Sequence, residues 1–428
     1  MPGATIDHLV AVVIFLVATL LFVNLFSQNL QNAILYQRNS QLATEASDIL
    51  DSISLSPGSL TGNSQYWATT NNIQNLGLFG LQDPNQEGYV IDPFSLMRLN
   101  ASNAGTPARA LFNGVWYSNV TMAPSGSYLF VPFGSVVNYT RAAQLLGING
   151  SYGFQLAIFP TLNVSMSQVR ANPLQICVTV TGSGLPLAGA SLNYYLINST
   201  NGSKYPKFQI LPSASVAYTG ATGSALLNFS SVNAGICAYA LVVYANLKGL
   251  SGVGYLVSTH PLMTNKIIPA VGSFSDGEGN ATILLAPSPS NAKLSFNATF
   301  LILCPSISSA VQLFIHNSTT SFFTVTGQLN SANQYAQIQI PNNNQTGILV
   351  ITYNSTATGS GISLLPWGIG SLGYTIVYGS AIPSSSNKDW VTTDVRQVMV
   401  AGESYQFKMT LWSLAGYQTQ GHSGGVGI

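Results

Sequence analysis

Charged side chains are scarce in this chain of 428 residues. They make up only 6% of it, whereas about 25% is typical of globular domains. The 13 Lys and Arg nearly balance the 12 Asp and Glu, so the formal net charge is +1. Such a chain lacks the basic footprint of a nucleic-acid-binding protein. Apolar residues reach 46%, which excludes an intrinsically disordered chain.

Histidine and cysteine are also rare, with four and three residues. An enzyme needs a perturbed acid or base in a cleft, and no such constellation is visible, so we predict no enzyme and no cofactor. Gly421–Gly425 fits G-x-S-x-G and Gly368–Gly373 fits G-x-G-x-x-G, but neither has the expected helix after it.

In an extracellular protein the odd cysteine count implies one pair and one thiol, or no pair, among Cys177, Cys237 and Cys304.

One weak metal candidate exists. Asp276, Glu278 and Asn280 alternate as the ligands of a Ca²⁺ loop do. No glutamate follows at the position that would complete such a loop. A hairpin turn is therefore the favoured interpretation of this segment.

The main positive feature is an uncharged apolar run at residues 9–26, LVAVVIFLVATLLFVNLF. At about 1.5 Å per residue it is about 27 Å long, enough to cross a bilayer core of about 30 Å with its flanks. A cleaved signal would need a basic start and a small-residue cleavage site. Residues 1–8 contain no Lys or Arg, and no A-x-A site follows the run. We therefore expect a retained membrane anchor.

The pattern predicts one helix from residue 5 to residue 55. Thr5 is a suitable N-cap, and Pro57-Gly58 is a common stop. The second half of this helix carries an apolar stripe, so we expect it to leave the membrane and pack one face against protein. The stripe consists of Leu30, Ile34, Leu42, Ala46, Ile49, Leu50 and Ile53.

The low charge suggests a particular environment. A chain with few carboxylates changes its net charge little in acid, so we hypothesise an acidic, hot external medium, as around a thermoacidophile. A surface solubilised by glycans is the compatible alternative. N-x-S/T sequons favour N-linked glycans and an external location for the C-terminal mass. The candidate sites are Asn100, Asn119, Asn138, Asn149, Asn163, Asn198, Asn201, Asn228, Asn280, Asn297, Asn317, Asn344 and Asn354.

Beyond the helix the sequence predicts a mainly β fold. Strands are expected at 127–133 and 154–160, with a short helix at 135–147. From about residue 166, short strands alternate with Gly, Asn, Ser and Pro turns, as in β-sandwiches. The predicted parts are a membrane or filament-core helix (1–58), a small α+β head (59–167) and two Ig-like sandwiches (168–260 and 261–428).

Three segments follow one another in the N-terminal part of the chain. They are GATID before the apolar helix, the continuation of that helix through YQRNSQLATEASDILDSISLSPGS to Trp67, and the later segment YTRAAQLLGINGSYGFQLAIFP. Together they resemble type IV pilin-like proteins, especially archaeal ones. The resemblance implies that the helix waits in the membrane and packs into a filament core on assembly. It also implies that Asp7 pairs with a neighbour's N-terminal amine and fixes register. Membrane or assembly roles fall to Leu9, Phe15, Leu20, Phe22, Phe26, Leu30 and Ile34.

A second resemblance lies in VTVTGSGLPLAGASLNYYL, residues 178–196. This segment is similar to Ig-like and carboxypeptidase-regulatory-like surface modules, in which a strand, a PLAGA turn and a second strand recur. The implied register places Cys177 and Cys237 on nearby strands. The resemblance thus implies a disulfide between them, and two free thiols are the alternative.

These features predict a cell-surface structural protein, a pilin-like subunit anchored or polymerised through its N-terminal helix. Its expected partners are membrane lipid, other copies or related pilin-like subunits, and N-linked glycans, with no nucleic acid. The expected location is the cell membrane with extracellular domains, or an extracellular filament. Two alternatives stay open: an anchored adhesin or S-layer-associated binding protein, and an accessory subunit of a membrane complex.

Overall fold

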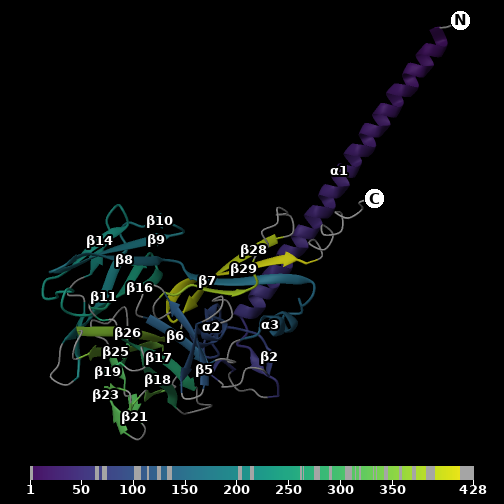
Figure 1. The fold of residues 1–428 in the computed structure, drawn as a ribbon. Helices are drawn as coiled ribbons and strands as arrows, with labels where there is room; N and C mark the ends of the chain where they lie inside the picture. Colours follow the sequence, from purple (N-terminus) through teal and green to yellow (C-terminus); the bar gives the residue numbers. More distant parts are fainter. Residues whose placement is uncertain are drawn as a thin grey trace, which may run out of the picture.

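The computed structural model confirms a mainly β fold: 52% strand and 22% helix, with one long N-terminal helix before many antiparallel sheets (Figure 1). The structure describes residues 3–414 with short gaps. The gaps are 63–66, 70–74, 101–107, 113–114, 123–126, 133–136, 201–204, 213–215, 261–262, 264, 274–279, 289–291, 304–310, 314, 318–319, 331, 334, 342–345, 356–358, 369–372 and 382–390.

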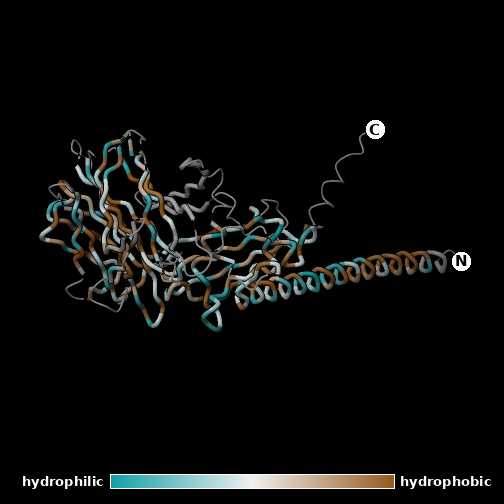
Figure 2. Tube along the Cα trace, turned by 90° about the horizontal axis from the view of Figure 1, so that it is seen from below, coloured by the Kyte–Doolittle hydropathy of each residue, from teal (hydrophilic) through white to brown (hydrophobic). Residues whose placement is uncertain are grey.

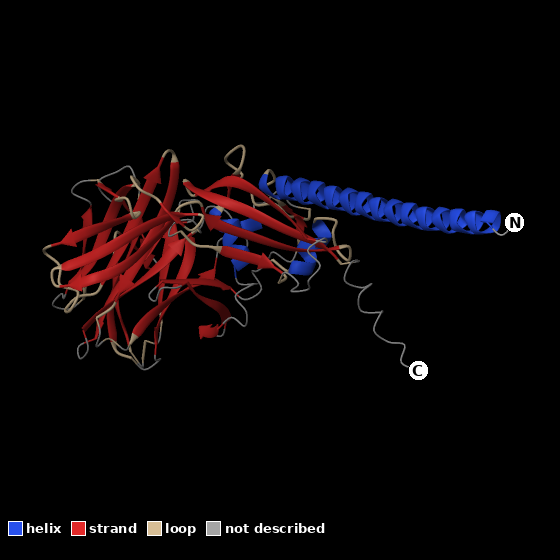
Figure 3. Ribbon diagram, turned by 90° about the horizontal axis from the view of Figure 1, so that it is seen from above, coloured by secondary structure: helices blue, strands red, loops and turns tan. Residues whose placement is uncertain are grey.

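Helix α1 spans Gly3–Ser54 and projects from the rest of the molecule (Figures 1 and 3). It matches the predicted helix to within two residues at each end. The predicted stop is built on Gly58, whose φ is 72°. A Cβ at Gly58 would lie 2.7 Å from Nε1 of Trp67, and this Nε1 donates to the Pro57 carbonyl at 2.8 Å. A glycine is therefore required where the chain leaves the helix.

The head is a layer of helices on an antiparallel sheet. In spatial order the sheet contains β27 (Ile376–Gly379), β7 (Tyr152–Pro160), β29 (Glu403–Ser413), β28 (Val391–Val400) and β3 (Val90–Ile91), the last parallel to β28. The helices are the end of α1 with η1 (Trp67–Thr69), α2 (Pro93–Asn100) and α3 (Tyr139–Leu145). Asn138 caps α3 by accepting from the amides of Thr140 and Arg141. A short pair, β1 (Ser59–Leu60) with β2 (Leu76–Leu78), completes this part.

Two sheets after the head form the first sandwich. One contains β8 (Asn163–Ala171), β9 (Leu174–Gly182), β10 (Leu185–Pro186) and β14 (Ser224–Phe229). The other contains β11 (Ser191–Thr200), β12 (Lys207–Pro212), β13 (Ala217–Tyr218), β15 (Tyr239–Leu247) and β16 (Leu250–Ser258). Alternate residues of β9, from Leu174 to Val180, are buried in the core between these sheets. This alternation is the period of a strand with one face inward.

Strand β15 departs from that alternation because both of its faces are covered. Leu241 and Val243 belong to the core of the first sandwich, whereas Ala240 and Val242 belong to the main core. The run YALVVYANL is therefore apolar almost throughout, as expected for a strand buried on both sides. The second sheet of the first sandwich is thus the middle layer of the molecule.

The remaining strands form two further sheets. One contains β17 (Lys266–Ser273), β18 (Asn280–Ser288), β24 (Ala336–Pro341), β21 (Ile315–Asn317) and β22 (Thr320–Phe322). The other contains β20 (Val311–Leu313), β19 (Leu294–Ile302), β23 (Val325–Leu329), β25 (Gly347–Ser355), β26 (Gly359–Trp367), β6 (Ser127–Pro132), β5 (Val115–Met122) and β4 (Ala108–Phe112). Their buried residues share the main core with the base of α1.

The predicted division into consecutive parts needs correction. Strands β27, β28 and β29 return to the head sheet, so the second sandwich does not extend over 261–428. Conversely, β4 to β6 come from the predicted head and extend a sheet of the second sandwich. The first sandwich begins with β8 at Asn163 rather than at residue 168. The predicted helix at 135–147 is the shorter α3, and α2 was not predicted.

Candidate functional site: an exposed apolar rod and its attachment to the head

The rod, defined as residues 8–41 of α1, is the most exposed apolar surface described in the structure. Every side chain in it except Leu35 is exposed, and Phe15 and Phe22 are each 70% exposed. Figure 2 shows the apolar colour concentrated toward its N-terminal end. Seven of the predicted membrane or assembly residues are exposed on the rod: Leu9, Phe15, Leu20, Phe22, Phe26, Leu30 and Ile34. Asp7 lies in α1, but its side chain is outside the described residues.

The rod is long and apolar enough to cross a membrane by length and composition. Its best window has a mean hydropathy of 2.9, and none of that window is buried inside the protein. Contiguous apolar surface of this size is rare on soluble monomers and marks an interaction with membrane or protein. The exposed apolar surface of the rod is therefore suited to contact with lipid or with other helices.

The base of α1, defined as residues 42–54, is packed instead. Leu42, Ala46, Ile49, Leu50 and Ile53 are buried in the main core, together with residues of β7 and β29. Their spacing places them on one face of the helix, as predicted. The same stripe includes Leu30 and Ile34, but these two lie beyond the head and stay exposed. The attachment to protein therefore begins at Leu42.

A polar clamp fastens the base to strand β28. The guanidinium of Arg396 donates to Asp51 Oδ1 at 2.9 Å, to Asp394 Oδ2 at 2.7 Å and to Ser47 Oγ at 2.7 Å. The Tyr89 hydroxyl also donates to Asp51 at 3.0 Å. The clamp joins residues 345 positions apart, so no local pattern in the sequence indicated it.

The clamp makes the head sensitive to acid. The hydrogen bond from Arg396 holds the pKa of Asp51 below its ordinary value, although burial opposes this effect. A carboxylate with a lowered pKa stabilises the fold above the pKa of the unfolded chain. That contribution is lost as the pH falls through the lowered pKa of the folded state.

Replacing Arg396 with alanine lowers the free energy of unfolding by about 1 kcal/mol, since the clamp is partly exposed to water. The difference from the wild type shrinks in acid, where Asp51 becomes protonated. Urea unfolding of the full chain in detergent at several pH values measures both effects. Lys408→Ala is the control, because Lys408 lies on the same hairpin but on the opposite face. An equal loss in the control would contradict the clamp.

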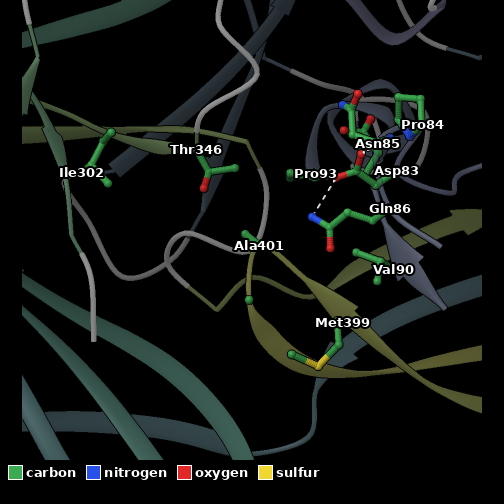
Figure 4. A pocket seen from close by; sticks show the side chains of 12 residues that line it. Asp83, Pro84, Asn85, Gln86, Val90, Pro93, Ile302, Thr346, Met399 and Ala401 are labelled. Carbon is green, nitrogen blue, oxygen red and sulfur yellow. Dashed lines mark hydrogen bonds between the residues drawn. The ribbon is translucent and has the colours of Figure 1, made fainter. Parts of the chain in front are cut away.

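A cavity of about 430 Å³ lies where the head meets the second sandwich (Figure 4). Asp83, Gln86 and Asp92 line it from the head, Thr346 from the second sandwich and Gly402 from the β28–β29 turn. Asp83 accepts from the Asn85 amide and the Gln86 side chain, and Asp92 accepts from the Ser95 amide at the start of α2. The two carboxylates thus hold nearby groups of the chain.

The predicted disulfide is not formed, because both Cys177 and Cys237 are free. Cys177 lies between the inward-facing Ile176 and Val178, so it faces the outer side of its sheet. Cys237 lies in the loop before β15 and donates to the Asn233 carbonyl at 2.9 Å. Burial raises the pKa of the Cys237 thiol.

The weak metal candidate mostly lies outside the described residues. Asp276 and Glu278 are in an undescribed segment, and Asn280 begins β18 with its side chain not described. Among the residues that are described, no group of three His, Cys, Asp or Glu side chains is arranged to hold a metal ion.

The sequons differ in exposure. Asn138, Asn149, Asn163 and Asn228 are exposed, and Asn354 is half-buried. Asn198 and Asn297 are buried, and Asn297 donates to the Pro206 carbonyl. A glycan on either buried asparagine would have no route to solvent in the folded protein, so burial disfavours these two candidates. Side chains outside the described set are those of Asn100, Asn119, Asn201, Asn280, Asn317 and Asn344.

Comparisons with known proteins add little. No protein-family model matches the chain, and no curated protein matches it. Among solved structures, the crystal structure of red sea bream transglutaminase is similar over 60% of this chain and 38% of that chain, with 12% identity and a TM-score of 0.18. The alignment spans less than half of that protein, and a TM-score this low carries no argument.

Proposed function

We propose that this protein is a structural component of a cell surface, a pilin-like subunit held in a membrane or a filament through its rod. The observation that carries the proposal is the division of α1. Its base is part of the core of a helix-on-sheet head, whereas its rod leaves the head with its apolar side chains exposed. Lipid and a bundle of like helices are the two environments that keep such a surface from water.

The order of segments supports the same proposal. The chain passes from the apolar helix into an α+β head, as the resemblance to pilin-like proteins implies, and β-sandwich-like sheets extend from the head. The strands gather at one end of the molecule, away from the N-terminal end of the rod (Figure 3). This arrangement presents the sheets outward when the rod is held in a membrane or a filament core. An anchored adhesin would use the same arrangement without polymerising.

Protease protection tests this proposal. In native membranes or surface filaments, residues 8–34 remain protected from a broad-specificity protease, whereas exposed loops of the head and sandwiches are cut from outside. Solubilisation in detergent without assembly removes the protection if filament neighbours supplied it. Rapid cutting of residues 8–34 in native material would contradict both the anchored and the assembled form.

Glycan occupancy follows from burial. We expect N-linked glycans at the exposed sequons Asn138, Asn149, Asn163 and Asn228, because a glycan attached at these positions extends into solvent. Asn198 and Asn297 stay unmodified. Glycopeptide mass spectrometry of protein from its native host measures each site. A glycan on a buried asparagine of folded protein, or bare asparagines at all four exposed sequons, would contradict the expectation.

A further inference from the structure

The tip of the β28–β29 hairpin joins the head to the first sandwich. Ala401 and Gly402 turn the chain with φ of 52° and 83°. Next to them, the Ser404 amide donates to Ser251 Oγ at 3.1 Å, and the Ser251 amide donates to Ser404 Oγ at 3.2 Å. The Thr161 amide, in the link between β7 and β8, donates to the Ser404 carbonyl at 2.9 Å. We call this contact the tip joint.

A carboxyl group is buried in the tip joint. Glu403 is only 4% exposed, and its Oε2 has no hydrogen-bond partner among the described residues. Tyr405 lies two residues along the strand and therefore on the same side. It is fully buried, and its hydroxyl likewise has no hydrogen-bond partner in the part of the chain that the structure describes. An ionised carboxylate placed here would be poorly solvated, whereas the neutral acid is tolerated.

None of the causes that shift the pKa of Glu403 is a charged side chain on the surrounding elements. On the paired strands, Asp394, Arg396 and Lys408 lie along the middle of the hairpin and not at its tip. Asp92 follows β3, and Lys248 precedes β16, while the described residues of β7 and β16 carry no charge. Burial raises the pKa of Glu403 to about 7, and the hydrogen bond between Glu403 and Ser251 opposes this rise. Burial also raises the pKa of Tyr405, which therefore stays neutral.

We propose that Glu403 is a proton-dependent latch, which in its neutral form holds the hairpin tip of the head against the first sandwich and in its ionised form releases it. The partner surface is β16 with the link between β7 and β8. The latch sets how firmly the outer sheets are fixed relative to the rod. It is independent of whether the rod lies in lipid or in a filament.

The direction of the pH effect follows from linkage. The folded chain keeps the Glu403 proton up to about pH 7, while the unfolded chain releases it near 4.5. The contribution of this group to stability is therefore complete below pH 4.5, declines as the pH rises, and has been lost above about pH 7. The joint is firm in an acidic medium and loosens in a mildly alkaline one.

Amide hydrogen exchange of the full chain in detergent tests the latch. After correction for intrinsic rates, amides around Ser251 and Ser404 should open about tenfold more often at about pH 9 than at about pH 5. Glu403→Gln, which mimics the neutral acid, should remove this dependence. Glu87→Gln is the matched control, since Glu87 is an exposed acid of the head, and it should behave as the wild type does.

Two results would overturn the latch: equal corrected protection of the wild type at both pH values, or an unchanged pH dependence in Glu403→Gln. Infrared titration of the wild type covers the case in which the variant fails to fold. Loss of a buried acid's carbonyl band near pH 7 supports the latch. Complete loss of all such bands below about pH 5 also overturns it.

Discussion

Replacing Leu50 with alanine lowers the free energy of unfolding by about 3 kcal/mol. Leu50 is fully buried in the base of α1, on the same face as Ala46 and Ile53. Truncation removes its contacts and leaves a cavity between the helix and the core it shares with the head sheet. Urea unfolding of the detergent-solubilised chain measures the change.

Leu30→Ala is the control for this prediction. It makes the same chemical change on the same helix, but Leu30 is 52% exposed and lies on the rod. Its effect on unfolding stays within about 0.5 kcal/mol. If the two variants lost equal stability, the division of α1 into an exposed rod and a packed base would be wrong.

Replacing Leu20 with arginine has the largest effect on localisation. Leu20 is 67% exposed near the middle of the uncharged run, so the change leaves the head intact. Arginine at the centre of a spanning helix costs about 2.5–3.5 kcal/mol, and an unpaired charge in an apolar filament core is also strongly unfavourable. We expect retention in membranes or filaments to fall by about a hundredfold.

Sedimentation and detergent extraction of native material measure that retention. Gln37→Arg is the matched control, because it adds the same charge to the same exposed helix outside the uncharged run. The control should stay with the pellet as the wild type does. A wild-type distribution for Leu20→Arg would show that the rod is not what holds the protein.

The parts of the fold that sequence predicted are those with local signals. The apolar run and the 3.6-residue stripe placed α1 to within two residues at each end, and strand-like segments placed β6 and β7. The parts it missed depend on distant pairing. Strand β29 joins β7 although about 250 residues separate them, and nothing in either segment encodes its partner.

The candidate site divides in the same way. The rod was predicted because hydropathy is local, whereas the bond between Arg396 and Asp51 links opposite ends of the chain. The free Cys177 was foreseeable: it alternates with the apolar Ile176 and Val178, which marks it as outward-facing. Nothing in the sequence indicated that Glu403 is buried, because a single acidic residue after a glycine is typical of a solvent-exposed turn.

Electron cryo-microscopy of native cell-surface material, with residues 9–30 located in the density, tests the central claim most directly. The account predicts that these residues lie in lipid or in a helical filament core, while the head and its sheets face outward. Residues 9–30 folded back into the chain's own globular part, or surrounded by water, would contradict it.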